Sequence, residues 1–328
     1  MSGVALLEAD GLSVEFPVHG GLLRREVARL RAVNQVSVEI RPGEVLGIVG
    51  ESGCGKTTLG RAMVGLYPPS AGTLRIEGRD VATLSADERR QMTRDVQMVF
   101  QDPFASLNPR KRIRQILEVP FEVHGLARGA AREARIRELM DLVGLASEHL
   151  DRWPHELSGG QRQRIGIARA LALQPRVVVL DEPLSALDMS IQSQVLNLLV
   201  ELQERLNLSY VFISHDLSIV EYLCDSVAVM YLGRVVEQAP AAALFASPRH
   251  PYTQALLDSV PNASPRRERS SRPLEGDVPG LLNAPTGCSF NTRCPRVQPR
   301  CHESAPELRA IDTSGLNRAA CHLLEARD

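Results

Sequence analysis

The chain has 328 residues, 44% of them apolar, and a formal net charge of −1 at pH 7. This length suits one large α/β domain with an appendage, or two modest domains. The near-neutral charge argues against a chain-wide basic surface for nucleic acid. No apolar run approaches the roughly 20 residues of a membrane-spanning helix, and the N-terminus lacks the basic region and apolar core of a signal peptide. We therefore expect a cytosolic chain with no nucleic-acid partner, which reaches any membrane through another protein.

The N-terminal part alternates between apolar and polar residues. This alternation predicts short strands at residues 12–16 and 36–40, separated by a basic, glycine-containing insertion at residues 20–31. Residues 45–49 are uniformly apolar and predict a buried strand, which leads into a glycine loop and a helix at residues 56–66.

The middle of the chain repeats the order strand, then helix. Residues 87–151 are mostly helical in pattern, and another helix begins near Gln161. The run at 177–180 is typical of a central parallel strand, a helix is expected at 189–206, and a further buried strand at 210–213. This order predicts a parallel sheet with helices on its faces, hence an α/β fold.

Residues 50–57 (GESGCGKT) match the pattern G-x-x-x-x-G-K-[ST] between a strand and a helix. Such a loop points successive N–H groups at phosphate oxygens, and the following helix adds the positive end of its dipole. Lys56 is expected to reach the β- and γ-phosphates, Thr57 to contact Mg²⁺, and Cys54 to serve as a small residue. A plain glycine-rich turn is the alternative, but only two of the 38 basic residues are lysine, which favours a chemical role for Lys56. The residues expected to contact ATP here are Gly50, Glu51, Ser52, Gly53, Cys54, Gly55, Lys56, Thr57 and Thr58.

Two carboxylates follow the apolar run at 177–180. Open α/β sheets bind their ligands at the carboxyl ends of the strands, so Asp181 suits Mg²⁺ coordination and Glu182 suits activation of the attacking water as general base. The alternative is an acidic pair that only caps a helix.

Residues 157–161 (LSGGQ) form a second glycine-rich turn at the start of a helix. Free N–H groups and a helix N-terminus make this turn another anion site. One nucleotide cannot use two such sites of one chain unless they are adjacent.

With this turn, the chain resembles the ATP-binding-cassette (ABC) ATPases over about residues 6–252. The resemblance implies a P-loop NTPase cassette with a RecA-like parallel sheet core, an antiparallel β subdomain and a helical subdomain. It also implies that the turn acts on the ATP of a partner subunit. The residues of the turn with this expected role are Ser158, Gly159, Gly160 and Gln161.

Further elements of the family pattern follow in order. Gln101 resembles the glutamine that contacts Mg²⁺ and water and senses the membrane subunits. Ser185 and Asp188 lie in a segment similar to the loop that crosses the dimer interface, and His215 resembles the histidine that contacts the γ-phosphate. Taken singly, Gln101 and His215 would be ordinary surface or core residues, but the ordered set excludes coincidence.

Phe16 resembles the aromatic residue that stacks on adenine, with Tyr67 as the weaker candidate. Residues 101–109, 187–192 and 250–253 are similar to those of oligopeptide and dipeptide permease ATPases. The narrower resemblance implies an ATPase subunit that energises import of di- or oligopeptides.

This resemblance also implies the partners and the location. We expect a heterodimer with a homologous ABC ATPase, two transmembrane permease subunits and an extracytoplasmic substrate-binding protein, at the cytoplasmic face of the cell membrane. Alternatives are an importer ATPase for another solute such as nickel, an exporter subunit, a soluble ABC ATPase and a regulator that does not hydrolyse ATP.

We expect residues 1–259 to form the nucleotide-binding domain, with its helical subdomain at about 102–160. Residues 260–285 are rich in Pro, Ser and Arg and are expected to be a linker, followed by a small cysteine-rich extension at 286–328. The arginines of the linker, expected to be a solvated run, are Arg266, Arg267, Arg269 and Arg272.

The extension holds four of the six cysteines, spaced by 6, 7 and 20 positions. Four thiolates could hold zinc or an iron–sulfur cluster, with His302 and His322 as substitute zinc ligands, or the thiols could stay free. The resemblance to dipeptide-permease ATPases, through the pattern Gly-Cys-x-Phe-x-x-Arg-Cys-Pro, implies a structural 4Fe-4S cluster. The expected ligands are Cys288, Cys294, Cys301 and Cys321.

Overall fold

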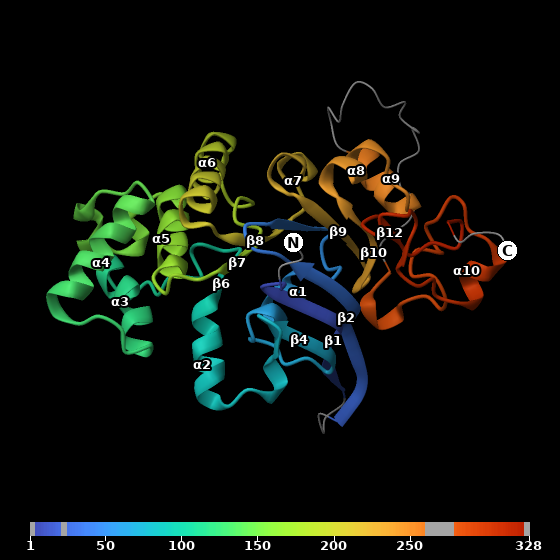
Figure 1. Ribbon diagram of the computed structural model, residues 1–328, viewed down its shortest axis with the longest axis horizontal. Helices are drawn as coiled ribbons and strands as arrows, with labels where there is room; N and C mark the ends of the chain where they lie inside the picture. Colours follow the sequence, from blue (N-terminus) through green and yellow to red (C-terminus); the bar gives the residue numbers. More distant parts are fainter. Residues whose placement is uncertain (1–3, 21–24, 260–278, 325–328) are drawn as a thin grey trace.

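The computed structural model describes residues 4–20, 25–259 and 279–324, and Figure 1 shows how their elements are arranged. Most of the expected linker, including its four arginines, lies outside the described residues. Within the described part, helices and strands form a large sheet, a smaller antiparallel sheet, a helical arm and a C-terminal extension.

The large sheet runs across the centre of the molecule. Its strands β6, β7, β8, β3 and β9 are parallel neighbours, and β10, β12 and β11 continue it in antiparallel pairing. In spatial order the strands are β6 (Val96–Val99), β7 (Val177–Asp181), β8 (Ser209–Ser214), β3 (Val45–Val49), β9 (Ser226–Tyr231), β10 (Arg234–Pro240), β12 (Arg318–Ala319) and β11 (Arg309–Ala310). The parallel core confirms the α/β fold that the sequence predicts.

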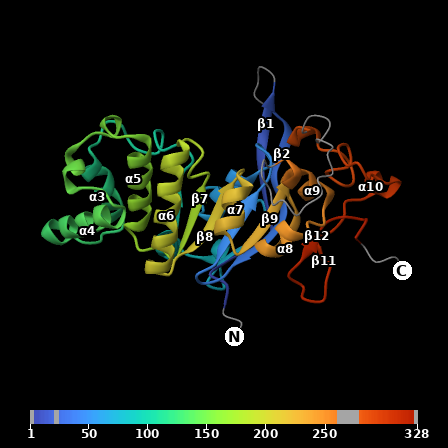
Figure 2. The ribbon, with the colours of Figure 1, turned by 90° about the horizontal axis from the view of Figure 1, so that it is seen from above.

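The parallel strands are buried on both faces, which explains their unbroken apolar sequence. Alternate residues of β7 belong to different cores: Val178 and Leu180 pack with the helices on one face, and Val177 and Val179 pack toward the antiparallel sheet on the other. Figure 2 shows α5, α6 and α7 alongside the parallel strands.

The helices described by the structure cover the sheet and form the arm. Those on the sheet and near the antiparallel sheet are α1 (Lys56–Met63), α2 (Ala86–Asp95), α5 (Gly159–Leu171), α6 (Met189–Leu206), α7 (Leu217–Leu223), α8 (Ala241–Ala246) and α9 (Pro251–Asp258). The arm at the left of Figure 1 consists of α3 (Ile113–Val123) and α4 (Gly129–Leu142), and α10 (Pro299–Glu303) lies in the extension. Helices α3 and α4 pack on α5 through buried aliphatic side chains.

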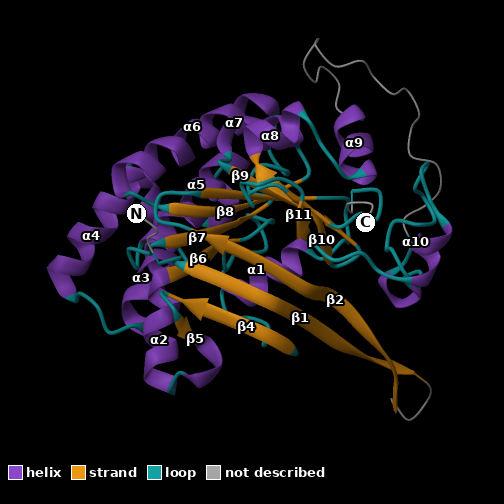
Figure 3. Ribbon diagram, turned by 45° about the vertical axis from the view of Figure 1, so that its right-hand side comes forward, coloured by secondary structure: helices purple, strands orange, loops and turns teal. Residues whose placement is uncertain are grey.

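The antiparallel sheet differs from the expected short strands. Its order is β2-β1-β4-β5, with β1 (Leu7–Gly20), β2 (Arg25–Ile40), β4 (Ala71–Ile76) and β5 (Arg79–Asp80). The expected insertion at 20–31 belongs largely to β2, and β1 and β2 form the long hairpin that projects in Figure 3. Pairing of Phe16 with Leu30 and of Val18 with Ala28 extends the ladder, which the charged residues of this segment obscure in the sequence.

Two further differences concern the strands around the core. The pattern at 87–151 reads as helical but includes strand β6, because a run of four residues is too short to show a clear period. Strands β9 and β10, which were not expected, pair through a tight turn at Leu232 and Gly233, both with positive φ. β10 then provides the edge to which the extension adds β12.

Candidate functional site

The phosphate-binding loop, residues 50–57, connects β3 to α1. The backbone at Gly55 has a φ of +106°, and a Cβ there would lie 2.2 Å from the carbonyl oxygen of Ala32. A Cβ on Gly50 would lie 2.2 Å from the carbonyl oxygen of Met230. Since both distances are far below contact, only glycine fits at these positions, and the path of the loop explains the spacing of the motif.

Lys56 lies across this loop and is 4% exposed. Its Nζ donates hydrogen bonds to the carbonyl oxygens of Gly50 at 2.7 Å and Glu51 at 3.0 Å. Both partners are neutral carbonyl groups, so they orient the ammonium without cancelling its charge. The neighbouring Cys54 is buried, and burial raises the pKa of its thiol; Cys54 therefore packs as a small neutral side chain.

Asp181 at the end of β7 meets Thr57 at the start of α1. The Thr57 hydroxyl donates to Asp181 Oδ1 over 2.9 Å, while Asp181 Oδ2 is buried and has no hydrogen-bond partner among the described residues. Burial raises the pKa of Asp181. A buried carboxylate oxygen without a protein partner requires compensation, and a carboxylate beside a threonine hydroxyl is an oxygen set that Mg²⁺ accepts. These two residues therefore fit a magnesium ion.

Three polar side chains meet where three adjacent parallel strands end. Gln101 follows β6, Glu182 follows β7 and His215 follows β8. Gln101 Nε2 donates to Glu182 Oε2 over 2.9 Å, and His215 Nδ1 lies 3.4 Å from the same oxygen. The backbone of Glu182 is left-handed, with a φ of +45°, and its N–H donates to Ile213. Sheet topology thus brings together residues that lie far apart in sequence.

These groups border one cavity of about 630 Å³. The cavity also receives apolar side chains that the sequence did not single out, from β2, from α9 and from Leu281 in the described end of the expected linker. Its lining residues are Phe16, Leu30, Ala32, Gly50, Glu51, Ser52, Gly53, Gly55, Lys56, Thr57, Thr58, Gln101, Glu182, His215, Leu256 and Leu281. A cavity with an apolar end and a glycine- and lysine-lined end suits a nucleotide, whose base and phosphates differ in the same way.

Phe16 lies on the apolar side of this cavity, and Tyr67 lies behind it. Their ring centroids are 5.1 Å apart with the planes at 83°, an edge-to-face contact. Tyr67 is not among the described residues that line the cavity. Its ring packs against Phe16 and does not border the cavity. Leu30 and Ala32 could have been found only by recognising the β1–β2 ladder.

The turn at 158–161 lies at the start of α5 and is not among the described residues lining the cavity. Ser158 caps the helix: its hydroxyl accepts from the N–H of Gln161 at 3.3 Å, and the Gln161 side chain accepts from the N–H of Ser158. A Cβ on Gly160 would lie 2.4 Å from Ile191 of α6, and Gly159 is partly exposed. The turn is therefore built tightly against α6 while Ser158 faces solvent.

The segment between Glu182 and α6 is also shaped by capping. Ser185 Oγ donates to the carbonyl oxygen of Glu182 at 3.0 Å, and the Asp188 carboxylate accepts from the N–H of Ile191 at the start of α6. Both side chains of this segment, Ser185 and Asp188, are exposed.

The four cysteines of the extension gather in one region. The pKa of Cys288 is raised to about 11, first by burial and then by the neighbouring thiols of Cys301, Cys321 and Cys294. The N–H of Cys288 donates to the carbonyl oxygen of Cys301 at 2.8 Å. Among the described residues, however, no set of three His, Cys, Asp or Glu side chains is arranged to hold a metal ion. As placed here, the thiols converge but do not fit a cluster. His322 instead bonds the carbonyl oxygen of Ser304.

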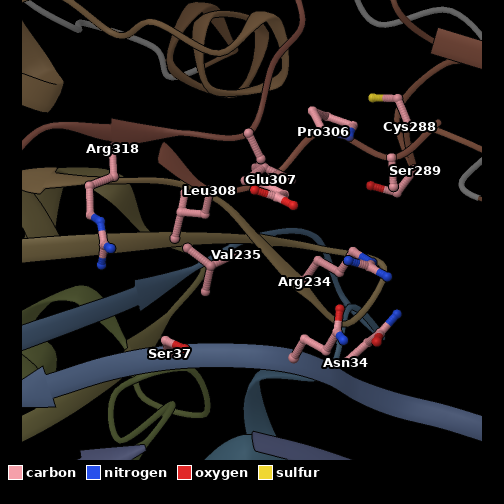
Figure 4. A pocket seen from close by; sticks show the side chains of 14 residues that line it. Asn34, Ser37, Arg234, Val235, Cys288, Ser289, Pro306, Glu307, Leu308 and Arg318 are labelled. Atoms are coloured by element: carbon pink, nitrogen blue, oxygen red, sulfur yellow. The ribbon is translucent and has the colours of Figure 1, made fainter. Parts of the chain in front are cut away.

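A second cavity, of about 420 Å³, lies between the extension and the cassette (Figure 4). Arg234 and Asn34 border it from the β-sheets, and Cys288, Glu307 and Arg318 border it from the extension. Cys288 therefore has an edge facing open space, although its residue surface is mostly buried.

Comparison with known proteins identifies the family. Residues 33–185 match the family model described as ABC transporter, and residues 236–301 match the model described as oligopeptide/dipeptide transporter, C-terminal region. The chain is 50% identical over 323 residues to the oligopeptide transport ATP-binding protein AppF of Bacillus subtilis, covering 97% of each chain. The chain belongs to the ABC transporter family. This ABC ATPase is also 47% identical to the di/tripeptide transport ATP-binding protein DppF of Pseudomonas aeruginosa, over 98% of each chain.

Solved structures agree with this assignment. The ABC ATPase is similar to CbiO1 of Clostridium perfringens, part of the ABC transporter complex CbiONQ, with a TM-score of 0.62 and 28% identity over 74% of this chain and 91% of the other. It is also similar to the ATP-binding cassette MJ0796, described as a dimer in a post-hydrolysis state with ADP and Pi. In that comparison the TM-score is 0.63, with 26% identity over 72% of this chain and 98% of the other. The expected P-loop ABC cassette fold is thereby confirmed.

Among the helices in the described part of the chain, none combines the length and the apolar character needed to cross a bilayer.

Proposed function

We propose that this ABC ATPase hydrolyses ATP to energise import of di- and oligopeptides across the cytoplasmic membrane. The observation that carries the proposal is the convergence of Gln101, Glu182 and His215 on the cavity of the phosphate-binding loop. The names of the similar AppF and DppF proteins, which specify peptide transport, support the choice of cargo.

Each polar group of the cavity has a distinct proposed role. Lys56 and the loop N–H groups bind the phosphates of ATP, with Phe16 against the adenine. Thr57 and Asp181 would hold Mg²⁺, assisted by Gln101, and the bound ion would supply positive charge against the phosphate oxygens. Glu182 accepts the proton of the attacking water as general base.

Gln101 and His215 orient the reaction from both sides of Glu182. Gln101 donates to Glu182 Oε2, which fixes the carboxylate for proton transfer. His215, whose Nδ1 lies 3.4 Å from the same oxygen, contacts the γ-phosphate in this proposal. The adjacent strand ends hold these three residues together before ATP binds, and proximity of this kind favours the reaction.

We further propose that two subunits enclose each nucleotide. Ser158, Gly159, Gly160 and Gln161 of one subunit face the ATP of the other, while Ser185 and Asp188 cross the interface. Support comes from the solvent-facing Ser158 at a helix N-terminus outside the chain's own cavity. The partner in this proposal is a different but homologous ABC ATPase chain, so the pair is a heterodimer.

The remaining partners are two transmembrane permease subunits and an extracytoplasmic substrate-binding protein, with the ATPase at the cytoplasmic face of the membrane. We place the permease contact at the loop that follows Gln101. Phe104 of this loop is 59% exposed, and the Arg162 guanidinium stacks on its ring at 3.9 Å. An exposed aromatic residue held in a fixed orientation is suited to an interface with another protein.

For the domains, we propose a nucleotide-binding unit at 1–259 with a helical subdomain at about 102–160, a linker at 260–285 and an extension at 286–328.

We also propose that Cys288, Cys294, Cys301 and Cys321 bind a 4Fe-4S cluster. The convergence of the four thiols supports this, but the sulfurs must draw closer together than they lie here. Iron, sulfide and zinc analysis of anaerobically purified protein decides between the cluster, zinc and free thiols.

Co-purification and reconstitution test the transport function. The ATPase, tagged in its own cell, is purified with its membrane partners and reconstituted into vesicles with the co-purified binding protein. We expect ATP hydrolysis to rise when the binding protein carries a dipeptide and uptake of labelled dipeptide to depend on ATP. Stimulation by nickel in place of peptide, export, or ATPase activity without membrane partners would each replace the proposal by the corresponding alternative.

A further inference from the structure

The extension contacts the phosphate-binding loop directly. Arg293, 242 residues after Glu51, donates two hydrogen bonds to its carboxylate, at 2.7 Å from Nη1 to Oε2 and 3.0 Å from Nη2 to Oε1. The Arg293 side chain is 6% exposed and the Glu51 side chain 25% exposed. A bidentate arginine–carboxylate pair that is largely buried from solvent is among the strongest contacts that side chains form.

Every polar part of Glu51 is held. Its N–H donates to the Tyr252 hydroxyl at 2.9 Å, its carbonyl oxygen accepts from Lys56 Nζ at 3.0 Å, and its carboxylate accepts from Arg293. Glu51 directly follows Gly50, where the loop begins. The extension therefore helps to fix the first turn of the loop, which also orients Lys56.

The remaining contacts show that Arg293 is anchored on the cassette. Phe290, three residues earlier, is fully buried and packs against both Tyr231 and Tyr252, with ring centroids 5.3 and 5.4 Å away. The Arg293 guanidinium lies 5.9 Å from the Tyr231 ring. Tyr252 thus contacts Phe290 with its ring and Glu51 with its hydroxyl, which forms a second connection between extension and loop.

We propose that Arg293 is a positioning residue for ATP binding: by holding Glu51 it sets the geometry of the phosphate-binding loop. The turn from Cys288 to Cys294 is then part of the nucleotide site, because Phe290 and Arg293 lie between these two cysteines. Any change that rearranges this turn is transmitted to Lys56 through Glu51. The inference rests on the ATPase activity alone and is independent of the transported cargo.

Steady-state ATP hydrolysis by the full chain, purified with its partner subunits, tests the proposal. Arg293→Ala should raise the KM for ATP by about 10-fold to 100-fold, because displacement of a binding group by about 1 Å has effects of this size, while kcat falls less. Arg293→Lys, which keeps one charged contact, should restore part of the loss. The control is Arg296→Ala, two residues after this turn and exposed, which should leave KM unchanged.

A double-mutant cycle separates positioning of the loop from general stabilisation. In the Glu51→Gln background, Arg293→Ala should add little further change in KM, because its partner is already weakened. Thermal unfolding without nucleotide should be similar for Arg293→Lys and wild type. If Arg293→Ala does not fold, the single variants Arg293→Lys and Glu51→Gln should still raise KM in parallel.

Two results would overturn the proposal. One is a KM of Arg293→Ala, or of Arg293→Lys and Glu51→Gln, equal to that of the Arg296→Ala control. The other is an effect of Arg293→Ala that is as large in the Glu51→Gln background as in wild type, since the arginine would then act only through the stability of the extension.

Discussion

The hydroxyl of Thr57 donates to Asp181 Oδ1 over 2.9 Å and so joins the first turn of α1 to the end of β7. The second oxygen of Asp181 is buried without a partner among the described residues. Folding therefore prepares a carboxylate whose negative charge is only partly compensated by the protein.

Asp181→Asn should reduce Mg²⁺-dependent ATP hydrolysis strongly without destabilising the nucleotide-free protein. Because burial raises the pKa of Asp181, its ionised form lowers folding stability at neutral pH, and a neutral amide removes that cost. The measurements are hydrolysis against free Mg²⁺ and thermal unfolding without nucleotide. Unchanged Mg²⁺ dependence would remove Asp181 from the metal site.

Lys56→Ala should weaken ATP binding by about 10-fold to 100-fold, since a charge-assisted hydrogen bond contributes about 1.5–3 kcal/mol. Equilibrium titration with a fluorescent ATP analogue measures the effect. Lys111→Ala provides the matched control, because Lys111 is the chain's other lysine and does not line the cavity. Equal affinities of the two variants would contradict the role of Lys56.

Glu182→Gln should retain ATP binding and lower hydrolysis by about 10²-fold to 10⁴-fold, the usual contribution of a general base. The amide keeps the shape of the side chain but cannot accept the proton. With ATP, the variant should stay in the closed dimer, which size-exclusion chromatography detects. Rapid turnover by this variant would assign the general base elsewhere.

Phe290→Ala should lower the free energy of unfolding by about 3–5 kcal/mol, the usual cost of removing a fully buried aromatic side chain. Denaturant titration of the intact chain measures this change. Leu316→Ala, also in the extension but 54% exposed, should change it by less than about 0.5 kcal/mol. Similar values for the two variants would mean that the extension does not unfold together with the cassette.

His250 should make the protein less stable as the pH falls from about 6.5 to about 4. Burial lowers the pKa of His250 to about 4, whereas an unfolded histidine has a pKa of about 6.5. Within this window the unfolded chain binds a proton that the folded chain does not. The free energy of unfolding therefore decreases as the pH falls, and this group lowers it by about 3 kcal/mol at pH 4 relative to neutral pH.

The His250→Asn variant isolates this contribution. Asparagine keeps an acceptor near the N–H of Tyr252, which bonds His250 Nδ1 at 3.1 Å, but does not titrate. Glu237 accepts from the N–H of His250, and burial raises its pKa, so its contribution has the opposite sign and is common to both proteins. Denaturant titrations between pH 4 and 7 should show a flatter pH dependence for the variant. Equal slopes would show that His250 is not the cause.

Several elements could be predicted because their signals are local. Helix α6 begins and ends where the sequence predicts, at Met189 and Leu206, since Asp188 caps its start and Asn207 adopts the left-handed conformation at its end. The glycines of the phosphate-binding loop and the apolar run of β7 are equally local, because they reflect backbone conformation and burial on both faces of a strand.

Other parts of the site are decided only by the tertiary structure. In the sequence, Gln101, Glu182 and His215 are separate candidates. The order of β6, β7 and β8 in the sheet brings Gln101 and His215 to the same carboxylate oxygen of Glu182. The paired hydrogen bonds from Arg293 to Glu51 leave no signal in the residue spacing or periodicity of the sequence. Such contacts depend on how distant segments pack together, and that is determined by the free energy of the whole fold instead of by any one stretch of chain.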